Sequence, residues 1–402
     1  MRLFKKLLLG LLGLLIISQI PFAYRRYKLG RLNAAIQQLN SQRVTSSVET
    51  GYNEYKGVLH VHSFLGGHSA GSFQEIIEAA KANGLQFVVM TEHPSSEFNT
   101  AAMTLKGSYA GVLFVNGNEA GTREGDRLLI IPGDQVTGRS GDYETRALLE
   151  HSKIDNQLAA IAYPVDFKGW DNAGYEAIEI YNVYTNARRI NPLIALCDTI
   201  WSLGSHHDLL FASFYARPSE AIAKWDQAGK SKRLVGLAGN DSHANVGLSL
   251  NDSSGKTLLG IKLDPYETSF HLVRMHVLIP QGKKLEESTL VGALKMGHCF
   301  IGFDLFGDTE GFSFSAGNSS DQRIQGDEIA LGDGVRLRVS SPIPARILLF
   351  KDGSQIQEAA AATSKEFEVK EKGNYRVELY LPQLGHPIAD QPWIISNPVY
   401  VK

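Results

Sequence analysis

Between residues 57 and 305, short apolar runs alternate with amphipathic segments, and several of the runs are followed by histidine or carboxylate residues. Each run has the length of a buried strand, and the segments between them have helical periodicity. Such an alternation predicts an α/β fold with a closed or nearly closed β/α barrel, whose functional groups lie at the carboxyl ends of the strands. The expected strands are 58–62, 87–91, 111–115, 127–131, 158–163, 177–181 and 234–238. The expected helices are 72–83, 143–152, 191–203, 218–227 and 286–296.

The helix expected over 72–83 has the clearest boundary signals. Ser72 can serve as its N-cap, and Glu75, three residues later, completes a capping box. Gly84 follows the last helical residue, where glycine commonly ends a helix.

Three histidines fall close together at positions 60, 62 and 68. His60 and His62 alternate along an expected strand, so both side chains should point to one face, with Leu59 and Val61 on the other. His68 would reach back toward them from the glycine-rich loop that follows.

Further candidate ligands come a few residues after later apolar runs: His93, Glu119, Asp241 and His243. A metal ion needs ligands that converge from several elements. A single buried histidine is usually a core residue whose hydrogen bonds are satisfied. Five histidines and two carboxylates at the ends of successive strands instead indicate a metal centre.

At these residues the sequence resembles the PHP family, named for polymerase and histidinol phosphatase. The matching motifs are HVHS at 60–63, His68 with Ser69, TEH at 91–93, NGNE ending at Glu119, EIYN at 179–182 and GNDSH at 239–243. The likeness covers residues 55–305 and is greatest to membrane-anchored or exported members with a β-rich C-terminal domain. It implies a distorted (β/α)7 PHP-type barrel that hydrolyses phosphate esters with two or three metal ions.

The resemblance also implies the role of each residue. Glu119 would bridge two ions, and Glu92 would be catalytic, transferring a proton; orientation of a ligand histidine is the alternative for Glu92. A donor set of imidazole nitrogen and carboxylate oxygen suits zinc, manganese or iron. The implied metal ligands are His60, His62, His68, His93, Glu119, Asp241 and His243.

The chain departs from the family pattern at Tyr163, which stands before Pro164 where the family commonly has a histidine. A second family histidine has no clear counterpart, because the only histidine in that interval is His151, on an expected helix. One of three metal positions is therefore in question. The adjacent pair His206 and His207 stays open as a substitute.

The N-terminus carries an uncharged apolar run, residues 7–24, flanked by basic residues on both sides. Its length is just sufficient for a helix that spans a bilayer. A cleaved signal peptide is the competing interpretation, but no small-x-small cleavage pattern follows the run. The run therefore predicts a signal anchor in a bacterial inner membrane, with the catalytic domain in the periplasm or otherwise outside the cytoplasm.

The texture of the sequence changes after residue 305. Residues 335–339 and 375–381 alternate with period two, 345–350 form another apolar run, and glycine turns separate such segments. This pattern predicts a small all-β sandwich-like domain. The expected organisation is a signal anchor over 1–24, a helical stalk or linker over 25–50, the barrel over 51–305 and the β-domain over 306–402.

Composition narrows the possible functions. The net charge of -2 gives no electrostatic argument for nucleic acid, and two cysteines exclude a disulfide framework. We therefore expect a phosphoesterase that attacks a small phosphorylated substrate with a metal-bound hydroxide. The alternative is a non-catalytic binding or scaffold protein of the cell envelope that retains some metal. The candidates for gripping a phosphate are Arg123, Arg139 and Arg217.

Overall fold

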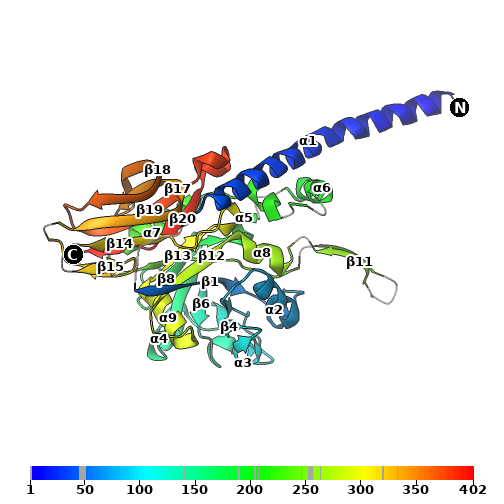
Figure 1. Ribbon diagram of the computed structural model, residues 1–402. Coiled ribbons are helices and arrows are strands. Elements are labelled where there is room, and N and C mark those ends of the chain that lie inside the picture. Colours follow the sequence, from blue (N-terminus) through cyan, green and yellow to red (C-terminus); the bar gives the residue numbers. More distant parts are fainter. Residues whose placement is uncertain are drawn as a thin grey trace.

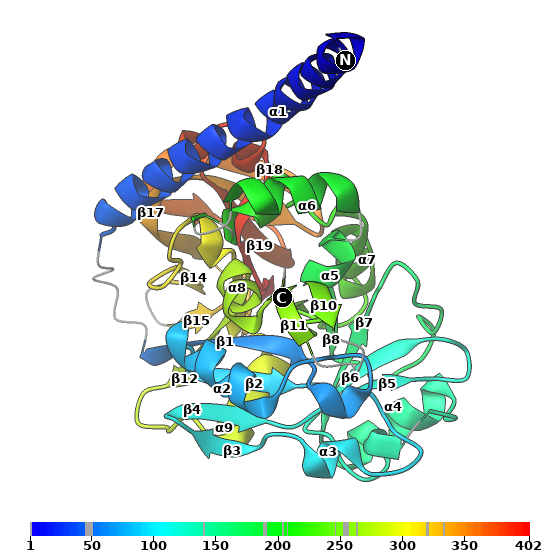
Figure 2. The same cartoon turned by 90° about the vertical axis from the view of Figure 1, so that its right-hand side faces the viewer.

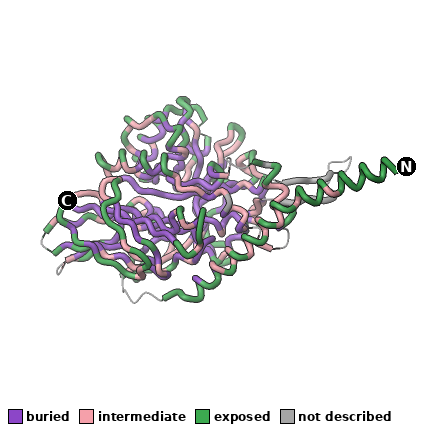
Figure 3. Tube along the Cα trace, turned by 90° about the horizontal axis from the view of Figure 1, so that it is seen from above, coloured by how far each residue is buried: buried purple, intermediate pink, exposed green. Residues whose placement is uncertain are grey.

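A computed structural model (Figure 1) shows a mixed α/β body from which one long helix, α1 (Arg2–Ser41), projects. Seen from above (Figure 3), the N-terminal part of α1 is exposed and stands clear of the body. The structure describes residues 2–44, 51–139, 141–187, 191–202, 205–206, 208–245, 247–251, 257–262, 264–318, 321–332 and 334–402. Part of the expected linker, 45–50, and His207 lie outside these residues.

The remaining helices pack around the sheets. The helices are α2 (Phe73–Ala82), α3 (Thr100–Met103), α4 (Thr145–Ile154), α5 (Val183–Ala187), α6 (Pro192–Ser202), α7 (Ser219–Gly229), α8 (Tyr266–Leu272) and α9 (Glu287–Met296). The strands before residue 305 are β1 (Tyr52–Val61), β2 (Phe87–Met90), β3 (Gly107–Tyr109), β4 (Val112–Val115), β5 (Asn118–Gly121), β6 (Arg127–Ile131), β7 (Leu158–Ala162), β8 (Ala177–Asn182), β9 (Val235–Gly239), β10 (Gly247–Asn251), β11 (Thr257–Lys262), β12 (Arg274–Pro280) and β13 (Cys299–Gly302).

Two sheets build the part of the body that carries the candidate ligands. In one, β1 runs parallel to β2 and β2 parallel to β4; in the other, β7, β8 and β9 run parallel to one another. Single bridges link the sheets where strands end, between Val61 and Ser242 and between Glu92 and Asn118. The carboxyl ends of β1, β2 and β9 therefore meet.

The expected mixed α/β class is confirmed, but a closed (β/α)7 barrel is not shown. Among the described residues the strands belong to separate sheets, and β6 is antiparallel to both β5 and β7. A short turn over 122–126 joins β5 to β6, which leaves no room for the crossover helix that parallel strands require.

The C-terminal part continues the first sheet. Its strands are β14 (Ser313–Gly317), β15 (Gln322–Ile324), β16 (Glu328–Ile329), β17 (Arg336–Lys351), β18 (Ser354–Glu368), β19 (Gly373–Tyr380), β20 (Pro392–Ser396) and β21 (Val399–Val401). Strand β20 pairs with β13, so one sheet of the described chain extends from β15 through β1 to β3. The side chain of Asn397 also bonds the backbone of Gly236 and Cys299. Strands before and after the expected boundary at 305/306 thus belong to one continuous sheet.

Helix α1 lies against this body through its C-terminal half. Ile36 and Leu39 are buried, and Leu29 and Leu32 pack on the same core. The N-terminal portion is exposed and is long and apolar enough to cross a membrane. Figure 2 shows α1 passing over β17 and beside α6.

Candidate metal centre

Four buried side chains converge at the ends of β1, β5 and β9: His60, His62, Glu119 and Asp241. Oε2 of Glu119 lies 3.2 Å from Nε2 of His60 and 3.3 Å from Nε2 of His62. Oδ1 of Asp241 lies 3.5 and 3.4 Å from the same two nitrogens. Each carboxylate therefore faces both imidazoles.

The spacing of these atoms fits one ion among them. Ligand atoms held ~2.0–2.1 Å from a zinc ion lie roughly 3.3 Å apart at the corners of a tetrahedron. Both ring nitrogens of His62 and Oδ1 of Asp241 are buried, yet within the described chain they make no hydrogen bond. Because buried polar atoms are normally paired, these three atoms indicate a missing ligand. The residues fit a divalent transition metal.

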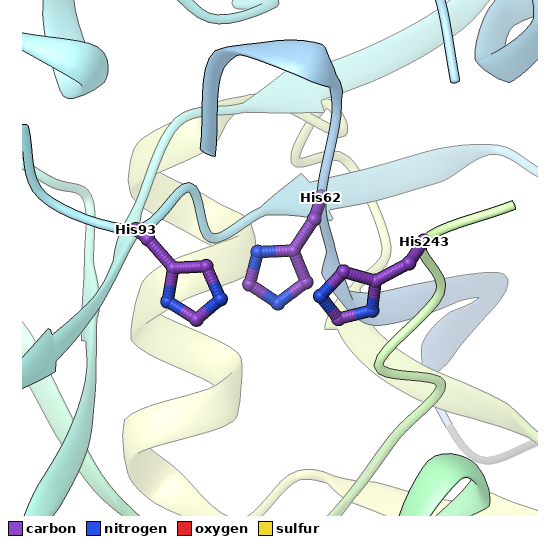
Figure 4. Close-up of side chains that lie close together, drawn as sticks. All are labelled: His62, His93 and His243. Carbon is purple, nitrogen blue, oxygen red and sulfur yellow. The ribbon is translucent and has the colours of Figure 1, made fainter. Parts of the chain in front are cut away.

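A second group shares His62 and adds His93 and His243. The three rings lie side by side (Figure 4), with centroids 4.5 Å apart for His62 and His93 and 4.3 Å apart for His62 and His243. The ring of His68, on the exposed loop, lies 5.1 Å from that of His93. His68 belongs to neither group, so its assignment as a ligand stays a prediction.

The two histidines of β1 converge through an irregularity and not through simple alternation. The pairing of β1 with β2 shifts register between Val58 and Val61, and His60 has a φ of 64°. Val61 packs in the same core cluster as Val58, whereas Leu59 packs in a different one. The expectation that Leu59 and Val61 share a face is therefore wrong, because the bulge interrupts the two-residue period.

Left-handed backbone recurs at this centre. Tyr163 and Asp241 both have a φ of 49°, at the ends of β7 and β9. Such conformations are uncommon for residues other than glycine and collect at functional sites, where surrounding contacts hold them. Here they turn side chains from three strand ends toward one point.

Glu179 and Asn182, at the end of β8, support the ligands from behind. Oε1 of Glu179 lies 2.6 Å from Nδ1 of His60, which leaves Nε2 of His60 facing Glu119 and Asp241. The amide of Asn182 donates to Glu179 at 3.0 Å and to Oδ2 of Asp241 at 3.1 Å. A carboxylate behind a ligand histidine fixes its tautomer and orientation. The motif EIYN at 179–182 includes both supporting residues, but the sequence alone did not assign a role to Glu179.

Tyr163 takes part in the same network. Its hydroxyl donates to Oδ2 of Asp241 at 2.7 Å. The position where a third ligand histidine was expected therefore holds Asp241 by a hydrogen bond.

The other histidines considered as substitutes lie elsewhere. His151 pairs with Asp134 at 2.7 Å on α4, and His206 lies against Gly30 of α1. Neither side chain belongs to the groups around His62.

Glu92 is buried beside the centre, but its hydrogen bonds go to other groups. Its carboxylate accepts from the backbone and hydroxyl of Ser63 and from the hydroxyl of Thr104. These bonds hold the chain where it turns after His62. The catalytic assignment of Glu92 stays a prediction, and the contacts favour a positioning role.

Electrostatics keeps Glu119, His93 and His243 in their metal-binding forms, whereas the neighbouring carboxylates raise the pKa of His60 and His62 despite their burial. Burial opposes the charge on Glu119, but the adjacent imidazoles of His60 and His62 hold the pKa of this carboxyl well below its usual range. Burial and the charge of His62 lower the pKa of His93 to about 3 and that of His243 to about 4. Both are neutral at pH 7, as a ligand histidine must be.

Two cavities of about 300 and 200 Å³ adjoin the centre, and both are lined by Tyr163. The first extends from Glu179 to Arg217, whose guanidinium is already paired with Glu378 at 2.6 Å. The second contains Arg127 and Tyr184. Among the residues that the structure describes, neither cavity is lined by a candidate ligand, and nor is a larger one of about 640 Å³ around Trp170. The two smaller cavities border the side chains that hold the ligands, which are Tyr163 in both and Glu179 with Asn182 in the first.

Comparisons with known proteins add little. No protein-family model and no curated protein matches the sequence. Among solved structures, the crystal structure of PsfC from Pseudomonas syringae PB-5123 aligns with 62% of this chain and 92% of its own, at 11% identity and a TM-score of 0.38. Likeness at this level supports no argument, so the resemblance to the PHP family stays a prediction.

Proposed function

We propose that the protein is a metal-dependent phosphoesterase of the PHP type, with a distorted barrel around the centre. The observation that carries the proposal is the convergence of His60, His62, Glu119 and Asp241, with buried atoms that lack hydrogen-bond partners. The overlapping group of His93 and His243 supports a second ion position. Zinc, manganese or iron suits this donor set.

Each residue of the centre would have a separate role in hydrolysis. Divalent ions bound here would lower the pKa of a water molecule and neutralise charge on the phosphoryl oxygens. Glu119 faces His60, His62 and His93, so its carboxylate would help to hold an ion at either position. Glu179 orients His60, and Asn182 with Tyr163 orients Asp241.

The position of Arg127 supports the proposal that the substrate carries a phosphate group. It lines the 200 Å³ cavity beside Tyr163 and Tyr184, and its charge acts on His93 after the larger effects of burial and His62. In the described part of the chain it has no ion-pair partner, whereas Arg123 pairs with Glu144 and Arg217 with Glu378. Arg127 is therefore a better candidate for binding the phosphate than Arg123 or Arg217, since its guanidinium has no ion-pair partner among the described residues.

We also propose that α1 anchors the protein in a bacterial inner membrane, with the body outside the cytoplasm. The exposed apolar portion of α1 supports the anchor. The orientation of the body stays a prediction.

Metal analysis and phosphatase assays on the full-length protein in detergent test the enzyme. Wild type should hold at least one tightly bound transition metal per chain and hydrolyse an aryl phosphate. His62→Ala should lower metal affinity and activity by more than about 100-fold, since loss of a ligand exceeds the cost of losing a supporting group. Arg127→Met should raise KM and leave metal content unchanged.

His386→Ala is the matched control, because His386 is exposed and pairs only locally with Asp390. It should behave as wild type. Wild-type protein that holds no metal and cleaves no phosphate ester would refute the proposal. Bound metal without hydrolysis of any phosphorylated substrate would favour the non-catalytic scaffold.

A further inference from the structure

Helix α6 exposes apolar side chains that the fold leaves uncovered. Leu193 is 70% exposed and Ile200 56%, and Ile194 and Trp201 are exposed as well. At 3.6 residues per turn these four positions fall within an arc of roughly 120°. They form one apolar face, which we call the α6 face.

The polar side chains of α6 form their ion pair and hydrogen bonds with α1 or within α6 itself. Asp198, the one charged residue of this helix, pairs with Arg25 of α1 at 2.9 Å. The indole of Trp201 donates to Gln19 of α1 at 2.9 Å, and the hydroxyl of Thr199 bonds within the helix. The α6 face therefore offers apolar contact and few hydrogen bonds, which suits hydrocarbon better than a polar partner.

These contacts fix the level of α6 along α1. Gln19 lies inside the apolar run 7–24, and Arg25 is the first charge after it. Six residues of helix separate them, a rise of about 9 Å. If Arg25 lies among the headgroups, Trp201 lies at the depth of ~5–10 Å at which interfacial helices insert. The exposed rings of Tyr24 and Tyr27 lie within about 3 Å of the level of Arg25 along α1, where an aromatic belt would lie.

We propose that α6 is an interfacial membrane helix, whose α6 face inserts among lipid acyl chains beside the anchor. The proposal rests on the membrane anchor proposed for α1, and it adds a second membrane contact. The α6 face is continuous with the exposed apolar surface of α1, because the two helices touch through Gln19 and Trp201. Lipid that surrounds α1 would therefore meet α6 without a gap.

Tryptophan fluorescence in liposomes tests this contact. The full-length protein is reconstituted into phosphatidylcholine vesicles with brominated acyl chains, which quench indoles that lie in the bilayer. The other three tryptophans, the half-buried Trp170 and the buried Trp225 and Trp393, lie in the body and serve as background, so the signal of Trp201 is the difference between wild type and Trp201→Phe. Wild type should be quenched, and Trp201→Phe should lose most of that quenching.

A second substitution shows whether the loss of quenching in Trp201→Phe reflects the depth of α6 in the bilayer or misfolding of the variant. In the Trp201→Phe background, Ile200→Trp should restore quenching, whereas Ile356→Trp, at an exposed position on β18, should not. Equal quenching of wild type and Trp201→Phe would overturn the proposal. So would quenching of Trp201 by acrylamide in the water, which would mean that α6 is solvated. Shielding from both quenchers would assign the face to a protein partner or a second copy.

Alkaline carbonate extraction distinguishes a failure of the anchor proposed for α1 from a failure of the contact proposed for α6. Protein released from the membrane by carbonate would refute the anchor of α1 and this inference together. Protein that stays in the membrane without quenching of Trp201 would refute only the role of α6.

Discussion

Tyr163 and Asn182 share one oxygen of Asp241 and so fix the other oxygen toward the histidines. This arrangement uses a hydroxyl where a third metal position would use an imidazole. Tyrosine also adopts the left-handed backbone of position 163 less readily than histidine does. The tyrosine is therefore held by its bond to Asp241 and its packing, and not by backbone preference.

Replacement of Tyr163 tests the number of ions. Tyr163→His places a ring nitrogen at the end of β7, without backbone cost, and should raise metal content by about one ion per chain. Tyr163→Phe should keep the metal content of wild type and lose about 1 kcal/mol of unfolding free energy, since one hydrogen bond disappears. Elemental analysis and denaturation measure the two effects. Unchanged metal in Tyr163→His would mean that the β7 position cannot hold an ion.

At this scale the sequence alone brought together four side chains at strand ends, while their role as metal ligands stays a prediction. His60, His62, Glu119 and Asp241 could be placed together because strand ends meet at one edge. The bulge at His60 could not be foreseen, because alternation is the default for a strand and a register shift depends on its neighbours. The part played by Glu179 was also hidden, since a carboxylate behind a histidine is recognised by distance alone.

At the scale of elements, β8 and β9 approach so closely that glycine is required between them. A Cβ added to Gly239 would overlap Oε1 of Glu179 and lie 2.8 Å from Cβ of His60. The last residue of β9 is therefore part of the support of the metal centre.

Gly239→Ala should push Glu179 away from His60 and weaken metal binding by about 10–100-fold, the effect of losing a supporting group. Titration with zinc and a chelator measures it. Gly292→Ala, in α9, is the control, because a Cβ there meets nothing within 4 Å. It should stabilise the protein by about 0.5–1 kcal/mol, as alanine does in a helix. Normal metal affinity in Gly239→Ala would show that Glu179 can shift without consequence.

The sequence predicted an element well where the residues that specify it all lie within that element. The helix expected over 72–83 is found as α2, and both hydrogen bonds of its capping box are present. The strand expected over 127–131 is found as β6. By contrast, β18 and β12 were not foreseen. Most of β18 is exposed, and its sequence has no regular alternation but includes four successive alanines, which favour a helix over a strand. The pairing of β12 with β1 joins segments far apart in the chain.

At the scale of the whole molecule, a buried charge network ties β1 to the chain that follows β13. Nδ1 of His276 lies 2.6 Å from Glu54, and its Nε2 lies 3.3 Å from Asp304. Arg274 pairs with Asp304 at 3.0 Å. Burial alone would lower the pKa of His276, but Asp304 and Glu54 outweigh it and raise that pKa to about 9.

This raised pKa predicts a stability that depends on pH. The folded protein binds the proton of His276 more tightly than the unfolded chain, whose histidine has a pKa near 6.5. The stabilisation is complete below pH 6.5 and is lost as pH rises through 9, by at most about 3 kcal/mol. Melting temperatures from pH 6 to 10 should fall more steeply for wild type than for His276→Gln, while other titrating groups cancel in the difference. Parallel profiles would mean that His276 is neutral in the folded protein.

The docking of α1 also sets how far the metal centre can reach. Leu29, Leu32, Ile36 and Leu39 attach the helix to the core, and Arg43 pairs with Asp308 at 2.7 Å. A flexible tether would let a catalytic body sweep a volume that grows with linker length. If α1 anchors the protein as proposed, this rigid attachment would keep the centre at one height above the bilayer, and its search for substrate would become two-dimensional and follow the diffusion of the anchor.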